Sequence, residues 1–367
     1  MLISMLLIPI LNKRYEKNQK IKYEEKRQKR YKKYINSKIK YIDNIMKKQK
    51  EILFDNYISE EECAKIILNR EPRLWERKIE DNDFLTVRVG TGDVPLEADI
   101  QYPQKEFTME DDNLVEILNT LVNKSKILKD VPITFSLAEK NISALIVQNN
   151  DRIIEKFIQN LIIQLVSLHS YEELKLVFLT KENTNNKWEH YKNLPHMWDN
   201  SKKIRFFADN FNDLKEVSRI LEAEFTNRTS IDRATYKNFA PYYLIITDDY
   251  KNVKNLKIIS DILKCKNNVG FGIFCISDNL VDLPNECKMF IELKDSDGMM
   301  FENEISSTSQ KKFKFDSSYT IFFERISKQI SNIPIKYSAN SQNSLPSSYS
   351  FLEMYDAGRI EQLNILD

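Results

Sequence analysis

The sequence predicts an α/β fold in which helices flank a mostly parallel sheet. The first observation is the stretch from Ile142 to His169, which has the pattern of a buried strand, a four-residue polar turn and a long helix. The second is the alternation that follows. Apolar strand patterns at 174–180, 204–208, 242–247 and 269–277 are interleaved with helical patterns at 214–225 and 255–264. Such alternation is typical of doubly wound sheets, and strand patterns at 288–293 and 299–302 are expected to complete this one as an antiparallel pair.

The turn of this first unit is the expected position of a phosphate site, in the manner of P-loop nucleotidases. There, glycines let backbone N–H groups face the anion and a lysine neutralises it. Here the turn and helix start are Gln148, Asn149, Asn150, Asp151 and Arg152, with no glycine, no lysine and an added carboxylate. None of the chain's 6 glycines precedes Lys-Ser or Lys-Thr. The sequence therefore predicts a P-loop-nucleotidase-like fold with a degenerate nucleotide site and no cofactor of its own.

A second feature of nucleotidases follows the strand at 242–247, which ends in Asp248 and Asp249. This has the form of a Walker B element, in which the first acid orients Mg²⁺ and the second polarises water. Aspartate is shorter than the usual second acid, and no phosphate loop faces it. We expect a structural role, no catalytic residue and no metal site, since His190 and His196 also lack a third ligand.

The N-terminal part of the chain is strongly basic. Residues 12–50 hold 16 Lys and Arg against 4 Asp and Glu, which gives this segment a net charge of +12. The whole chain has a net charge of only +1. With no Pro or Gly from 12 to 54, a long basic helical stalk is expected over 12–70. Residues 1–11 are apolar but shorter than the roughly 20 that cross a bilayer. They are expected to be the end of a transmembrane or membrane-anchoring segment, with the basic residues on its cytoplasmic side.

The remaining regions follow from local patterns. Residues 71–333 form the degenerate ATPase-like domain, which begins with a small β-hairpin region: a strand at 84–89, a turn at 90–93 and a second strand at 94–102. Residues 334–367 are expected to be a linker, because 338–348 are rich in Ser and Asn. Four scattered cysteines without a metal-ligand spacing indicate reduced thiols.

Several arginines and aromatic residues are interface candidates, because these residue types dominate binding surfaces. They are Arg73, Trp75, Arg77, Arg88, Trp188, His196 and Trp198. The alternative interpretation is structural: Trp75 covers a domain edge, and the loop with Trp188 and Trp198 packs as an aromatic edge.

Four stretches, in order and spacing from Arg73 to Asp367, resemble the EssC/EccC family, the FtsK/SpoIIIE-type membrane ATPases of type VII secretion. The stretches are PRLWERKIEDNDFLTVRVGTGDVPL, LVSLHSYEELKLVFLT, WEHYKNLPHMWDN and LPSSYSFLEMYDAGRIEQLNILD. The resemblance implies a juxtamembrane stalk and a degenerate first ATPase-like domain, followed in the parent by motor domains that use ATP and Mg²⁺. It also implies hexamer assembly, contact with other secretion membrane components, and export of WxG-type proteins by way of the later domains.

The function expected from these features is non-catalytic: coupling or assembly between the membrane anchor and the ATPase domains, at the cytoplasmic face of the cell membrane. One alternative is a weak nucleotide-binding regulatory domain that uses the divergent turn. Another is a DNA-translocase fragment, suggested by the basic arm. The residues outside 12–50 together have a net charge of −11. This negative charge disfavours a nucleic-acid partner for the main domain.

Overall fold

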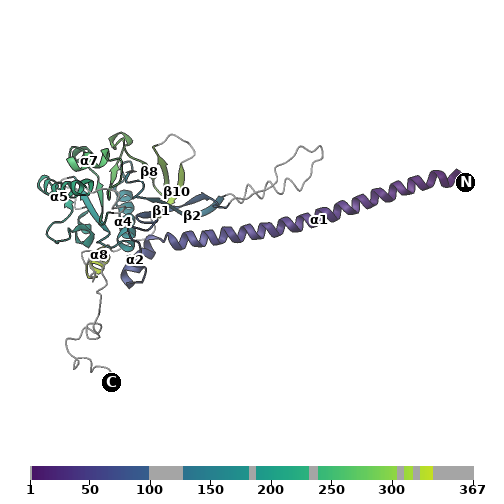
Figure 1. Ribbon diagram of the computed structural model, residues 1–367, viewed down its shortest axis with the longest axis horizontal. Coiled ribbons are helices and arrows are strands. Elements are labelled where there is room, and N and C mark those ends of the chain that lie inside the picture. The colour runs from purple at the N-terminus through teal and green to yellow at the C-terminus, as the bar shows by residue number, and fades with distance from the viewer. Residues whose placement is uncertain are drawn as a thin grey trace, which may run out of the picture.

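One sheet organises the protein. The computed structural model describes residues 2–98, 127–181, 187–230, 239–303, 310–316 and 323–333. Within these residues ten strands form a single sheet in the order β2-β1-β10-β9-β8-β3-β7-β6-β4-β5 (Figure 1). The α/β class predicted from the sequence is confirmed.

The parallel half of the sheet carries the nucleotidase-like unit. Its strands are β8 (Met289–Lys294), β3 (Ile142–Ile146), β7 (Phe271–Ser277), β6 (Tyr242–Thr247), β4 (Leu174–Leu179) and β5 (Phe207–Ala208). On one face lie α2 (Glu60–Asn69), α4 (Asp151–Leu168) and α8 (Phe323–Ser331); on the other lie α5 (Phe211–Ser230) and α7 (Lys257–Lys264). Because both faces are covered, these strands are apolar almost throughout.

The other half of the sheet is antiparallel. It consists of β2 (Ile127–Ser136), β1 (Thr86–Pro95), β10 (Lys311–Phe315) and β9 (Asp297–Glu302), and β9 pairs with β8 as the sequence predicts. The hairpin prediction is wrong. Residues 90–93 lie inside β1, whose partners are β2 and the distant β10.

The glycines of β1 explain that error. A Cβ built on Gly90 would lie 2.0 Å from the Lys314 carbonyl oxygen, and one on Gly92 would lie 2.5 Å from that of Lys312. The register of β1 against β2 also shifts near both glycines. They therefore mark β-bulges and a close approach of β10, which local sequence cannot distinguish from a turn.

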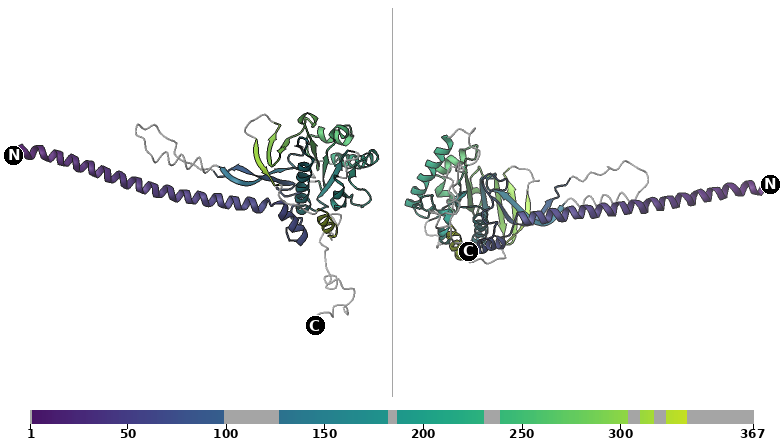
Figure 2. Two further views of the ribbon diagram at one scale, coloured as in Figure 1. Left: turned by 180° about the vertical axis from the view of Figure 1, so that it is seen from behind. Right: turned by 60° about the horizontal axis from the view of Figure 1, so that its bottom comes forward.

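The basic N-terminal region is a single helix, α1 (Leu2–Asn56), which projects from the globular part, with β1 and β2 lying beside its base (Figures 1 and 2). Within the described residues, no helix combines the length and apolarity needed to cross a membrane. Helix α2, grouped with the stalk by sequence, instead buries Cys63, Ile66 and Ile67 against the core and packs on α4. The projecting helix therefore ends at Asn56. The linker expected at 334–367 lies outside the described residues.

Candidate functional site

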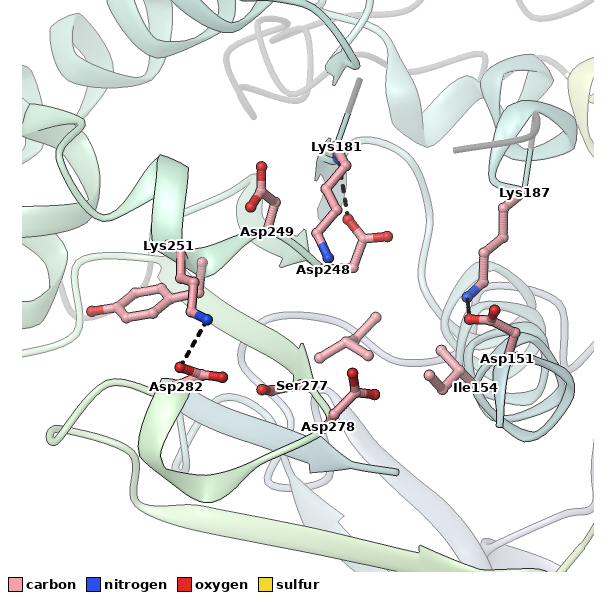
Figure 3. Close-up of a pocket in the computed structure, with 12 residues that line it drawn as sticks. Asp151, Ile154, Lys181, Lys187, Asp248, Asp249, Lys251, Ser277, Asp278 and Asp282 are labelled. Carbon is pink, nitrogen blue, oxygen red and sulfur yellow. Dashed lines mark hydrogen bonds and ion pairs between the residues drawn. The ribbon is translucent and has the colours of Figure 1, made fainter. Parts of the chain in front are cut away.

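The expected nucleotide position lies at the C-terminal edge of β3, β6 and β7, where a cavity of about 210 Å³ opens (Figure 3). Carboxylates and lysines dominate its lining. The charged members are Asp151, Asp248, Asp249, Asp278 and Asp282, with Lys181, Lys187 and Lys251. This volume is below the roughly 300–1,000 Å³ usual for small-molecule sites.

The start of α4 is closed by side chains of the protein itself. Asn150 is the N-cap, and its side-chain oxygen accepts a hydrogen bond from the Ile153 N–H at 3.3 Å. Lys187 lies 2.7 Å from the Asp151 carboxylate, and this hydrogen bond holds the pKa of Asp151 below its ordinary value. A helix N-terminus that could receive an anion therefore already has a side-chain cap and a carboxylate in its first turn.

The two acids that follow β6 also have partners within the protein. The Trp188 indole N–H donates to one Asp248 oxygen at 3.0 Å, and the Lys181 backbone N–H donates to the other at 3.4 Å. Asp249 is the N-cap residue of the short helix α6 (Tyr250–Val253), and its carboxylate accepts from the Asn252 amide at 2.7 Å. These contacts give both aspartates structural functions.

The cavity has an excess of negative charge. Five aspartates face three lysines, and two of those lysines are already paired: Lys187 with Asp151, and Lys251 with Asp282 at 3.1 Å (Figure 3). In the part of the chain that the structure describes, no group of three or more His, Cys, Asp and Glu residues is placed to hold a metal ion. Carboxylates that outnumber lysines distinguish this lining from a phosphate site, where cations and backbone N–H groups face the anion.

Comparisons with known proteins are consistent with this architecture. No family model matches the chain. The type VII secretion system protein EssC of Staphylococcus aureus (strain NCTC 8325 / PS 47) is 24% identical over 360 residues, which cover 96% of this chain and 24% of that protein. The ESX secretion system protein YukB of Bacillus subtilis (strain 168) is 25% identical over 357 residues, which cover 95% of this chain and 23% of that protein. The chain therefore resembles the EssC/EccC family over almost its whole length.

A solved member of the EssC/EccC family shares the fold. The cytoplasmic domain of the Thermomonospora curvata type VII secretion ATPase EccC gives a TM-score of 0.50 at 12% identity, covering 77% of this chain and 35% of that one. The present chain spans about a quarter of the length of the curated relatives it matches.

Four of the interface candidates are buried inside the fold of this chain and cannot form an exposed surface. They are Arg77, Arg88, Trp188 and His196, which are between 0% and 8% exposed. Trp188 and Trp198 also fail to come together: Trp188 contacts Asp248 at the cavity, whereas Trp198 stacks with Arg205 at 4.5 Å and pairs with its backbone. The interface prediction is therefore wrong for the four buried residues, which have structural functions instead.

Three arginines complete the end of the stalk helix. The last turn of a helix leaves carbonyl groups without intrahelical partners and carries partial negative charge. Each arginine donates a hydrogen bond to one backbone carbonyl oxygen: Arg73 to Asp55 at 2.9 Å, Arg77 to Asn56 at 2.7 Å, and Arg88 to Tyr57 at 3.2 Å. We call this arrangement the stalk joint. The sequence picked out all three arginines but indicated an interface as their function.

The stalk joint also contacts the far end of α4. The backbone N–H groups of Trp75 and Arg77 donate to the carbonyls of Ser167 and Leu168 at 2.8 and 2.9 Å, and the Trp75 indole donates to Val166 at 3.0 Å. One short segment therefore caps the C-terminal ends of both α1 and α4.

A second tie joins β1 to α4. The Gln164 side-chain oxygen accepts from the Arg88 N–H, and its amide donates to the Arg88 carbonyl, both at 2.8 Å. The Arg88 guanidinium also lies 2.7 Å from the Asp316 carboxylate. Gln164 sits among apolar residues of α4, and nothing in its sequence context indicates this contact.

Proposed function

We propose that this chain is a non-catalytic coupling domain of a type VII secretion motor, which links a membrane-side stalk to ATPase domains elsewhere in the parent protein. Similarity to EssC and YukB over almost the whole chain supports the role in type VII secretion. The non-catalytic part rests on the C-terminal edge of β3, β6 and β7, which we call the closed nucleotide edge. There, Asn150, Lys187 and Trp188 bind the backbone and carboxylate groups that would otherwise face a nucleotide.

Electrostatics supports this proposal. Two unit charges about 5 Å apart interact with roughly 3 kcal/mol at an effective dielectric constant of 20. One uncompensated carboxylate facing a phosphate oxygen therefore reduces affinity by roughly a hundredfold. The cavity has two more aspartates than lysines. We infer that ATP and Mg²⁺ act in other domains of the parent.

The coupling part of the proposal rests on the stalk joint. Rigid elements and continuous hydrogen-bonded contacts are what carry energetic coupling between distant sites. Helix α1 is tied through the stalk joint to α4, the helix that begins at the closed nucleotide edge. A displacement of the stalk therefore has a direct route into the ATPase-like fold.

The same proposal includes the location and partners of the parent. The many basic residues of α1 suit the anionic cytoplasmic leaflet of a membrane. Assembly toward a hexamer, contacts with other membrane components and export of WxG-type proteins are proposed for the whole protein, on the basis of its family.

Calorimetry with Mg-ATP tests the proposal. We expect no binding at micromolar concentrations by the wild type, by Asp248→Ala or by the control Asp278→Ala, which changes an exposed aspartate of the same cavity. Micromolar affinity in the wild type that is reduced by Asp248→Ala and retained by Asp278→Ala would instead establish a nucleotide-binding regulatory domain.

A further inference from the structure

A second and larger cavity lies at the opposite edge of the parallel sheet, where β4 and β6 begin. Its volume is about 500 Å³, within the range of small-molecule sites. Its lining comes from the start of β4 and the residues before it, from the loop before β5, from the segment before β6 and from Ser331 at the end of α8. The cavity is therefore separate from the closed nucleotide edge, which lies at the C-terminal ends of the same strands.

Lys175 is the unusual residue of this cavity. It is the second residue of β4, a strand that is otherwise apolar, and it is only 3% exposed. Its ammonium lies 5.8 Å from the centre of the Tyr171 ring, and among the described residues it has neither a hydrogen bond nor an ion pair. Burial lowers the pKa of Lys175 to about 8. The ammonium lines the cavity without an acceptor from the described residues, so a ligand in the cavity can supply one.

The neighbouring carboxylates do not serve as that partner. Asp199 lines the cavity, but one of its oxygens accepts from the backbone N–H groups of Lys203 and Ile204 at 2.8 and 2.9 Å, and the other accepts from Ser201. Glu172 and Lys202 also line the cavity, so its four charged side chains sum to zero. A ligand with one negative charge can pair with Lys175. A phosphate dianion would place a second negative charge in a cavity that already holds the carboxylates of Glu172 and Asp199.

The walls of the cavity indicate the rest of the ligand. Tyr171, Trp198, Pro195 and Pro241 line the cavity together with Lys175, and the Tyr171 ring faces its ammonium. We propose that this cavity binds a monocarboxylate attached to an aromatic or aliphatic body, with Lys175 as the partner of the carboxylate. A small organic acid and a peptide C-terminus share this chemistry.

The experiment compares N-acetyl-phenylalanine with N-acetyl-phenylalanine amide, which has the same body without the charge. Affinities are measured by calorimetry for the wild type, for Lys175→Met and for the control Lys202→Met, an exposed lysine of the same cavity. The tripeptide Gly-Gly-Phe with a free carboxylate, compared with its amide, distinguishes a peptide end from a small acid.

We expect the wild type and Lys202→Met to bind at least one carboxylate with a dissociation constant of about 1 mM or tighter, and at least about tenfold more tightly than the matching amide. Lys175→Met should lose that preference. No binding of either carboxylate, equal binding of acid and amide, or a preference that survives in Lys175→Met would overturn the proposal.

A second measurement does not depend on how well the variant folds. In wild-type protein with ¹³C-labelled lysine, the Lys175 resonance should titrate near pH 8 without ligand. The carboxylate should raise this pKa, because an adjacent negative charge favours the ammonium. The amide should leave it unchanged. A Lys175 pKa that fails to rise with the carboxylate rejects the assignment.

Discussion

Replacing Arg77 by Met tests the stalk joint most directly. The change keeps most of the apolar stem but removes a guanidinium that donates to the carbonyls of Asn56 and Thr86 at 2.7 and 2.8 Å. A buried acceptor left without a partner costs about 1–3 kcal/mol. The ion pair of Arg77 with Asp83 adds little, because the Asp83 side chain is 43% exposed. Water can reach Asn56, so the loss comes mainly from the Thr86 carbonyl, and we expect a decrease of about 1–3 kcal/mol in the free energy of unfolding.

The matched control for this change is Arg73→Met. Arg73 donates to the adjacent carbonyl of Asp55, but its side chain is 34% exposed and its ion pairs lie near the surface. We expect a loss of about 1 kcal/mol or less in urea unfolding. Equal losses in the two variants, or a loss below about 1 kcal/mol for Arg77→Met, would show that the joint does not hold the stalk in the way described.

The joint also makes a prediction about geometry that a purely local structural role does not. Spin labels on the exposed positions Lys40 and Glu216 report the distance between stalk and globular part. In a background with Cys265 replaced by Ser, the protein with an intact stalk joint should give a narrow distance distribution by double electron–electron resonance. Arg77→Met should broaden it at temperatures where the globular part remains folded. A distribution of unchanged width would argue against transmission through the joint.

Two further predictions concern pH and membranes. Burial lowers the pKa of both His169 and His196 to about 3. The folded state therefore disfavours their charged forms, so the stability they contribute is complete above about pH 6.5 and is lost as the pH falls toward 3. When the pH is lowered from 7.5 to 5, each histidine should reduce the free energy of unfolding by about 2 kcal/mol. Guanidinium unfolding of His196→Gln should therefore show a decrease over this pH range that is about 2 kcal/mol smaller than the decrease in the wild type. Separately, the chain should sediment with phosphatidylserine vesicles but not with phosphatidylcholine vesicles. Replacing Lys26, Arg27, Lys29 and Arg30 by Gln should weaken its affinity for phosphatidylserine vesicles by about 100-fold or more at low salt. An unchanged affinity would contradict the proposed location.

The parallel half of the sheet was predictable because its signal is local. The strand Tyr242–Thr247 begins and ends at the predicted residues, and α4 begins at Asp151, within the predicted turn and helix start. Apolar periodicity and capping residues act over a few positions, so a single sequence contains them. The absence of a phosphate loop was equally visible, since it depends on residue types alone.

The parts that the sequence did not reveal depend on contacts between distant segments. The pairing of Lys187 with Asp151, and of Trp188 with Asp248, joins the loop after β4 to two other strand ends. Gly90 and Gly92 resemble turn residues until β10 is placed against them. A lysine in the apolar strand LKLVFL was a local signal for Lys175, but the cavity around it is formed by four separate segments.

The burial of the arginines changes what their presence means for function. An exposed arginine contributes to binding partners, whereas Arg77 and Arg88, at 3% and 8% exposure, are committed to the protein's own carbonyls. Their acceptors lie at the end of α1, and the same segment completes the end of α4. A stalk attached only by a flexible chain would need none of these bonds. Caps shared between two helices keep the helices in a fixed relation, which is what the proposed coupling function requires.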